Sequence, residues 1–158
     1  MAETFVAGCA DLLGVAFIIG VSRGITVLMN DGGITDTILH WGEEALSGTG
    51  AVSFVLLVYL LYLPLTVLIP SSSGLATLSV PIMAPLGEFA GVGGDLVVTA
   101  FQSASGLVNI VTPTAAVVMG ALALGHVPYD RWLKYVWKLV AYFLLLTMVF
   151  LVAGVWLG

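Results

Sequence analysis

The chain has 158 residues, of which 60% are hydrophobic and 8% charged, and its mean hydropathy is +1.15. Soluble domains are about 45–50% apolar and about 25% charged, so four basic and nine acidic side chains are too few to cover a soluble protein of this size. This composition excludes a soluble enzyme and a disordered chain, and a net charge of −5 argues against nucleic acid as a partner, because phosphates are neutralised by Lys and Arg. We therefore expect an all-α integral membrane protein, with the lipid bilayer as the main partner of its surface.

The first apolar stretch predicts a transmembrane helix over residues 4–29, interrupted by Asp11 and Arg23. An intramembrane carboxylate is by default a proton or cation site, whereas one near a helix end reaches water, and Asp11 fits both interpretations. A glycine-containing turn at 30–33 then leads into residues 34–46, where apolar and acidic residues fall on opposite faces of a helix. That segment is too short and too charged to span, so we expect a helix lying in the membrane interface.

Residues 47–87 contain no charged residue, a run of 41. One straight helix of that length would reach roughly 60 Å, about twice the thickness of the hydrocarbon core. The run must therefore turn back, and the Pro-Ser-Ser-Ser-Gly cluster at 70–74 predicts the corner. We expect a re-entrant helical hairpin over residues 51–89, with limbs at 51–69 and 75–89; two ordinary spans joined by a small extramembrane loop are the alternative.

A second charge-free run of 34 residues follows Asp95 and would reach roughly 50 Å as one helix. Its middle, residues 109–114, reads Asn-Ile-Val-Thr-Pro-Thr, and the proline removes a helical hydrogen bond. We expect a broken transmembrane helix over residues 96–124, with half-helices at 96–108 and 115–124. The alternative is a helix that only bends at its proline.

The last predicted element is a transmembrane helix over residues 129–157. Arg131, Lys134 and Lys138 lie on its first turns, and 19 uncharged residues follow from Leu139 to Leu157. Because three of the four basic residues lie at this end, the positive-inside rule places it in the cytoplasm and the C-terminus outside. We therefore expect a multi-pass protein of the cytoplasmic membrane.

Two uncharged polar breaks inside a membrane domain are typical of secondary transporters. The N-termini of half-helices attract anionic groups, and unwound carbonyls coordinate cations. The candidate substrate- and ion-binding residues are Ser71, Ser72, Ser73, Gly74, Thr77, Asn109, Thr112, Pro113 and Thr114. The oxygens suited to Na⁺ belong to Ser72, Ser73, Asn109 and Thr112. No cofactor is expected beyond a coupling Na⁺ or H⁺, since no His, Cys, Asp or Glu cluster has metal-ligand spacing.

Two other function classes are alternatives to transport. Ser105-Gly106 with His126 downstream is weakly similar to the serine–histidine dyad of rhomboid-type intramembrane serine proteases. Ser103 stands where those proteases have a glycine, and His126 is predicted near the interface, so we do not expect an enzyme. A non-transporting membrane scaffold or subunit is the other alternative, but it would not require two polar breaks.

The stretch from Ile69 to Leu86, with its serine corner and two later prolines, resembles the C-terminal hairpin of the YfcC family. That family groups with the anaerobic C4-dicarboxylate carriers of the DcuC type, within the ion transporter superfamily. Residues 20–26, 109–114 and 128–133 match its C-terminal pattern as well. The resemblance covers essentially the whole chain, which corresponds to about the C-terminal third of such a carrier.

This resemblance implies a secondary transporter built from inverted repeats, each with an interfacial arm helix, a re-entrant hairpin and a broken helix. It implies homodimers that work by an elevator-like movement, with the remainder of the carrier or an opposite repeat completing the site. The implied substrate is a small carboxylate-bearing metabolite, either an amino acid such as arginine or ornithine or a C4-dicarboxylate. Better-known relatives carry Ser-Asn-Thr at the hairpin tip, where this chain has Ser71, Ser72 and Ser73. In the broken helix they place Pro and Asn where this chain has Thr114 and Ala115.

Overall fold

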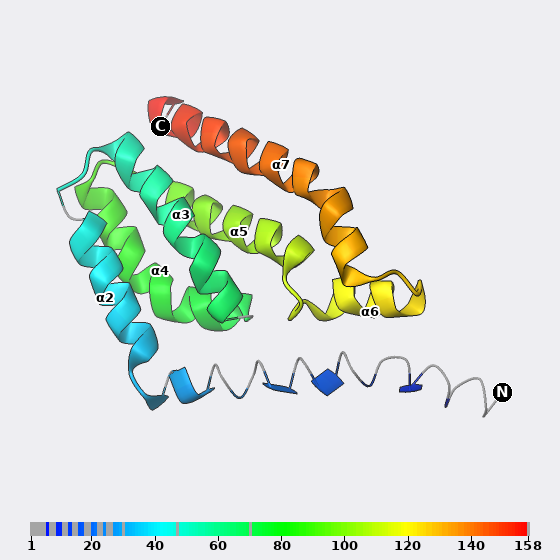
Figure 1. Cartoon of the computed structure of the whole chain (residues 1–158). Helices are drawn as coiled ribbons and strands as arrows, with labels where there is room; N and C mark the ends of the chain where they lie inside the picture. Colours follow the sequence, from blue (N-terminus) through cyan, green and yellow to red (C-terminus); the bar gives the residue numbers. More distant parts are fainter. Residues whose placement is uncertain are drawn as a thin grey trace.

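The computed structural model describes residues 31–46, 48–69 and 71–157, together with positions 6, 9, 10, 13, 16, 17, 20, 21, 24 and 27–29 (Figure 1). The described residues form helices and turns, with no strand among them. The elements in chain order are α2 (Ile34–Leu46), α3 (Ala51–Leu68), α4 (Ser72–Phe89), α5 (Gly94–Val111), α6 (Ala116–Leu124) and α7 (Tyr129–Leu157). Most of the predicted span over 4–29 lies outside the described residues, as do Asp11, Arg23 and Pro70.

Among the residues that the structure describes, three segments are long and apolar enough to cross a membrane. They are α3, the α5–α6 segment Gly94–Leu124 and α7, with mean hydropathies of 2.3, 1.9 and 2.4. Large apolar side chains on the outer side of α7, such as Tyr142, Leu145 and Val149, are exposed, as expected for a surface that faces lipid. The expected all-α integral membrane class is therefore confirmed.

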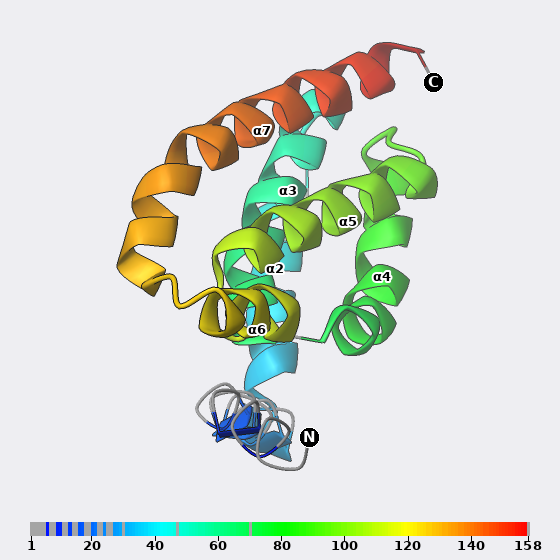
Figure 2. The same cartoon turned by 90° about the vertical axis from the view of Figure 1, so that its right-hand side faces the viewer.

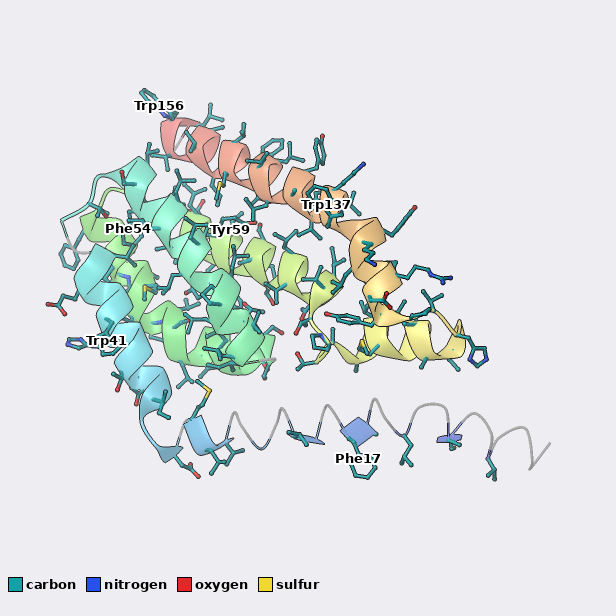
Figure 3. All side chains as sticks on the ribbon, in the orientation of Figure 1. Phe17, Trp41, Phe54, Tyr59, Trp137 and Trp156 are labelled. Atoms are coloured by element: carbon teal, nitrogen blue, oxygen red, sulfur yellow. The ribbon has the colours of Figure 1, made fainter. Side chains whose placement is uncertain are left out.

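The core forms where α3, α4 and α5 pack together and α7 lies across α3 and α5 (Figure 2). Figure 3 shows Phe54 and Tyr59 of α3 pointing into this core. Its largest fully buried side chains include Phe54, Tyr59, Tyr62 and Leu65 of α3, Leu75 and Met83 of α4, and Leu151 of α7. The two limbs of the hairpin and the first half of the broken helix thus share one packed core.

A glycine lets the helices approach closely near the far end of the hairpin. A Cβ at Gly87 of α4 would lie 2.7 Å from Val97 Cγ2 of α5 and 3.4 Å from Phe54 Cε1 of α3. Small residues at helix contacts bring backbones together in this way inside membranes. Gly87 is therefore one point at which α3, α4 and α5 approach closely.

The helix boundaries at the hairpin differ from those expected. The second limb begins at Ser72 and not at Leu75, because Ser71 caps the helix: its Oγ accepts a hydrogen bond from the Gly74 amide at 3.2 Å. The serines at 72 and 73 therefore belong to the first helical turn and not to the corner, and α3 ends one residue before the expected Ile69.

The boundaries of the broken helix also differ. α5 begins at Gly94 and continues through Asn109 to Val111, and α6 begins at Ala116, so the link comprises residues 112–115 and not 109–114. A proline disfavours the helical conformation in the residue before it. Accordingly Thr112 is extended, with φ −73° and ψ 134°, and the helix ends one residue earlier.

Helix α2 packs against α3 and α4. Leu46 at its end is buried in the core, whereas Ile34 and Trp41 are exposed, and Figure 3 shows Trp41 pointing away from the bundle. Its location in the membrane interface stays a prediction.

Candidate functional site at two helix interruptions

The structure brings the two predicted polar clusters to the same end of the helix group. The corner between α3 and α4 and the link between α5 and α6 lie at the lower end of the bundle in both views (Figures 1 and 2). Both α3 and α4 pack along α5. The packing therefore places residues separated by about forty positions in sequence at one level of the membrane domain.

The first turn of α4 offers two exposed hydroxyls. Ser72 and Ser73 are exposed. Ser71 is half-buried, and its Oγ accepts a hydrogen bond from the Gly74 amide. A Cβ at Gly74 would lie 3.1 Å from that oxygen, so glycine leaves room for the cap. Thr77 is exposed, but its hydroxyl donates to the Ser73 carbonyl at 2.8 Å. Of the predicted hairpin residues, Ser72 and Ser73 are thus the most accessible to a ligand.

The link between α5 and α6 is a closed turn. The Ala115 amide donates to the Thr112 carbonyl at 3.2 Å, and the hydroxyls of Thr112 and Thr114 lie 2.9 Å apart. Thr112 is buried and Thr114 is half-buried, whereas Pro113 and Asn109 are exposed. The two threonines therefore form one hydroxyl pair, and Asn109 lies on the last turn of α5 and not in the link.

Helix α6 begins at this link with no side chain capping its first turn. Its first intrahelical bond runs from the Met119 amide to the Ala115 carbonyl, at 3.0 Å. The three amides before Met119 have no earlier helical carbonyl to bind. The N-termini of both α4 and α6 therefore present backbone donors at the same end of the bundle.

Two aromatic side chains of α7 bind the carbonyl end of α5, and the sequence did not predict either contact. The Tyr129 hydroxyl donates to the Val111 carbonyl, and the Trp132 Nε1–H donates to the Ile110 carbonyl at 3.0 Å. Both residues lie in the stretch 128–133, which resembles the C-terminal pattern of the YfcC family, but the sequence assigns neither of them a role. Because the bonded residues are 18 and 22 positions apart in sequence, local sequence patterns do not predict these contacts.

The structure does not assemble the weak protease motif. Ser105 is 2% exposed in the middle of α5, whereas His126 lies in the exposed turn after α6, with φ 51°. Figure 1 separates the middle of α5 from the far end of α6. Within the described part of the chain, no group of three His, Cys, Asp or Glu residues could hold a metal ion.

Residues 1–156 match the C4-dicarboxylate anaerobic carrier family, DcuC. An uncharacterized protein of Haemophilus influenzae is 37% identical over 97% of the chain, which covers 30% of that protein. An Escherichia coli K12 protein named "Putative basic amino acid antiporter YfcC" is 32% identical over 85% of the chain, which covers 28% of it. The chain thus spans less than a third of the length of either relative. No solved structure is significantly similar to it.

Proposed function

We propose, since the chain belongs to the C4-dicarboxylate anaerobic carrier family, that it forms part of a secondary transporter for a small carboxylate-bearing metabolite. The substrate is an amino acid such as arginine or ornithine, or a C4-dicarboxylate. Transport is coupled to an ion, Na⁺ or H⁺, or to exchange of a second solute. In this proposal the chain binds the solute and gates its passage, and it does not catalyse a reaction.

The observation that carries this proposal is that the N-termini of α4 and α6 lie at the same end of the bundle. A helix N-terminus carries roughly half a positive charge and unsatisfied amides, which together favour a carboxylate. The first turn of α4 adds the hydroxyls of Ser72 and Ser73, and the link before α6 adds those of Thr112 and Thr114. Such a site is suited to the carboxylate that all the proposed substrates share.

The same region offers ligands for a cation. α5 ends at Val111 with its carbonyls directed towards the link, and its C-terminus carries roughly half a negative charge. Carbonyls at broken helices coordinate coupling ions in transporters. Hydroxyl oxygens of Ser72, Ser73 and Thr112 and the amide oxygen of Asn109 complete the proposed Na⁺ ligand set.

The candidate residues are uncharged, so the second charged group of either substrate class needs a partner elsewhere. A basic amino acid carries a cationic side chain, and a C4-dicarboxylate carries a second carboxylate. We propose that the rest of the carrier, including an opposite repeat, supplies that partner, and that the protein works as a homodimer. The chain covers less than a third of the length of either relative, which is consistent with a site completed by further residues.

The proposed orientation places the start of α7 in the cytoplasm and the C-terminus outside. Arg131, Lys134 and Lys138 are exposed on the first turns of α7, as residues in water or headgroups are. In this orientation the hairpin of α3 and α4 enters the cytoplasmic membrane from outside and returns to the same side.

Uptake into proteoliposomes separates the two substrate classes. The full-length protein is reconstituted and tested with labelled arginine, ornithine and succinate, with and without a Na⁺ gradient. Uptake of arginine or ornithine would agree with the name of the Escherichia coli relative, and uptake of succinate with the description of the family. A folded protein that takes up none of the three would favour a scaffold.

Cysteine accessibility tests the site itself. In a Cys9→Ser background, Ser72→Cys and Thr112→Cys are labelled with a membrane-impermeant thiol reagent. We expect substrate or Na⁺ to slow the labelling of both, while Glu88→Cys, at the exposed far end of α4, serves as the control. In the proposed orientation an ordinary loop at this corner faces the cytoplasm, so labelling of Ser72→Cys from that side, in inside-out vesicles, at a rate independent of substrate and Na⁺ would show that the corner is an ordinary loop.

A further inference from the structure

The carbonyl end of α5 is held by a neighbouring helix. The last carbonyls of any helix have no partner within it, and Pro113 removes one more donor because it has no N–H. Here the Ile110 carbonyl accepts from Trp132 and the Val111 carbonyl accepts from Tyr129. The end of the helix that leads into the proposed binding link is thus satisfied by side chains of α7.

The two donors are placed to fix the orientation of that end. Tyr129 and Trp132 are three residues apart on the first turn of α7, so their side chains lie on the same face. Both are half-buried, and the Trp132 amide is itself bonded to the Pro128 carbonyl at 3.1 Å. Two bonds to consecutive carbonyls restrict both the distance and the rotation of α5 relative to α7.

We propose that Tyr129 and Trp132 are positioning residues of the transport site, which hold the Thr112–Ala115 link in the geometry that binds substrate and coupling ion. This inference rests on the proposed transport function. A carbonyl oxygen has two lone pairs, so a carbonyl that accepts from α7 retains a second lone pair for a cation. The donors therefore orient the carbonyls without removing them from the site.

Loss of either donor has a defined consequence. Both bonds are part-buried, so a carbonyl that loses its donor binds water or turns away. The adjacent turn, closed by the Ala115 amide and the Thr112 carbonyl, then opens more often. The binding groups of the link are present in such a variant but are held less often in the binding geometry.

Two substitutions remove one donor each and keep the aromatic ring: Tyr129→Phe and Trp132→Phe. The same helix supplies matched controls, Tyr135→Phe and Trp137→Phe, whose side chains are 81% and 59% exposed. All four variants are made in the full-length protein in lipid nanodiscs, and amide hydrogen exchange is followed across residues 112–119. We expect exchange to be roughly three- to tenfold faster in the first two variants, the effect of losing one hydrogen bond, and unchanged in the controls.

Uptake kinetics then separate positioning from a merely structural contact. We expect the KM for substrate and the ion concentration for half-maximal uptake to rise by a factor similar to that of the exchange rate. The maximal rate should change less. Size-exclusion profiles check folding, and if Tyr129→Phe does not fold, Trp132→Phe carries the test.

Three results would overturn the inference in distinguishable ways. Unchanged exchange in both variants shows that the contacts do not hold the link, whether or not the protein transports. Faster exchange with an unchanged KM shows that they stabilise the fold but do not position the site. If the wild type takes up no substrate and no substrate alters exchange at 112–119, the proposed function fails and the positioning role fails with it.

Discussion

The Tyr62 hydroxyl donates a hydrogen bond to the Ser79 Oγ at 3.1 Å and so joins the two limbs of the hairpin. Ser79 in turn donates to the Leu75 carbonyl at 2.7 Å, and the Tyr62 ring meets the Phe101 ring edge-on, with centroids 5.2 Å apart. Tyr62 and Ser79 are fully buried. One tyrosine therefore connects α3, α4 and α5, and it does so within the core that supports both interruptions.

Substitution of Tyr62 should separate its hydrogen bond from its packing. We expect Tyr62→Phe to lower the free energy of unfolding by about 0.5–1.5 kcal/mol, the net contribution of a typical intramolecular hydrogen bond. Tyr62→Ala should cost about 3–5 kcal/mol because it leaves a cavity. Denaturant titration in detergent measures both, with the exposed Tyr142→Phe as control. A Tyr62→Phe variant as stable as the wild type would show that the bond contributes nothing.

Substitution of glycine by alanine should have different effects on stability at two positions. Gly87→Ala forces a methyl group to within 2.7 Å of Val97 Cγ2, and the stiff valine side chain cannot move away cheaply, so we expect a loss of about 1–3 kcal/mol. A Cβ at Gly106 of α5 meets nothing within 4 Å, so Gly106→Ala should be neutral or slightly stabilising. Equal melting temperatures of the two variants in detergent would contradict the close approach at Gly87.

Two substitutions of Ser71 separate the effect of the α4 helix cap from the effect of an added negative charge. Ser71→Ala removes the acceptor for the Gly74 amide and should cost about 1 kcal/mol of stability. Ser71→Asp restores an acceptor and should recover that stability, but it places a negative charge beside the proposed carboxylate site. We expect the KM for an anionic substrate to rise by roughly tenfold or more in the aspartate variant, since close like charges cost on the order of 1 kcal/mol or more. Parallel melting and uptake curves measure both effects, and an unchanged KM would place the substrate elsewhere.

The hydroxyl pair of the link should act as a unit. Thr112→Val and Thr114→Val each remove one member of the 2.9 Å pair, so we expect each to weaken ion-dependent uptake and the double variant to be no worse than the stronger single one. Thr99→Val on the preceding helix α5 is the control, because its hydroxyl donates to the Asp95 carbonyl one turn earlier. Fully additive effects on half-maximal ion concentration would show two independent contacts.

In the part of the chain that the structure describes, the positions of the few charges predicted where long apolar segments had to be interrupted. Runs of 41 and 34 uncharged residues are too long for single spans, and each is interrupted where a proline follows or precedes hydroxyl-bearing residues. The errors lay at the boundaries. Ser71 serves as a cap and so starts α4 before Leu75, and Pro113 acts on Thr112 and so allows α5 to continue through Asn109.

The polar contacts between helices could not be predicted in the same way. Tyr62 with Ser79, and Trp132 with Ile110, join residues 17 and 22 positions apart on different helices. Neither tyrosine nor tryptophan is distinguished from its apolar neighbours by helical periodicity, since a buried aromatic with a polar tip fits the same face. Only the packing of the helices shows which acceptor each tyrosine hydroxyl or tryptophan N–H binds.

The length of α7 determines how deep the link between α5 and α6 lies. Its 29 residues extend about 43 Å, against roughly 30 Å of hydrocarbon, and the 19 residues that follow Lys138 account for about 28 Å. In the proposed orientation the turns that carry Tyr129 and Trp132 therefore lie among the cytoplasmic headgroups, and their bonds hold the end of α5 close beneath them. In that orientation a solute from the cytoplasm would reach this end without crossing the hydrocarbon. In a bilayer a few Å thicker, the same turns would be drawn inwards, so lipid chain length is expected to govern access to the link from that side.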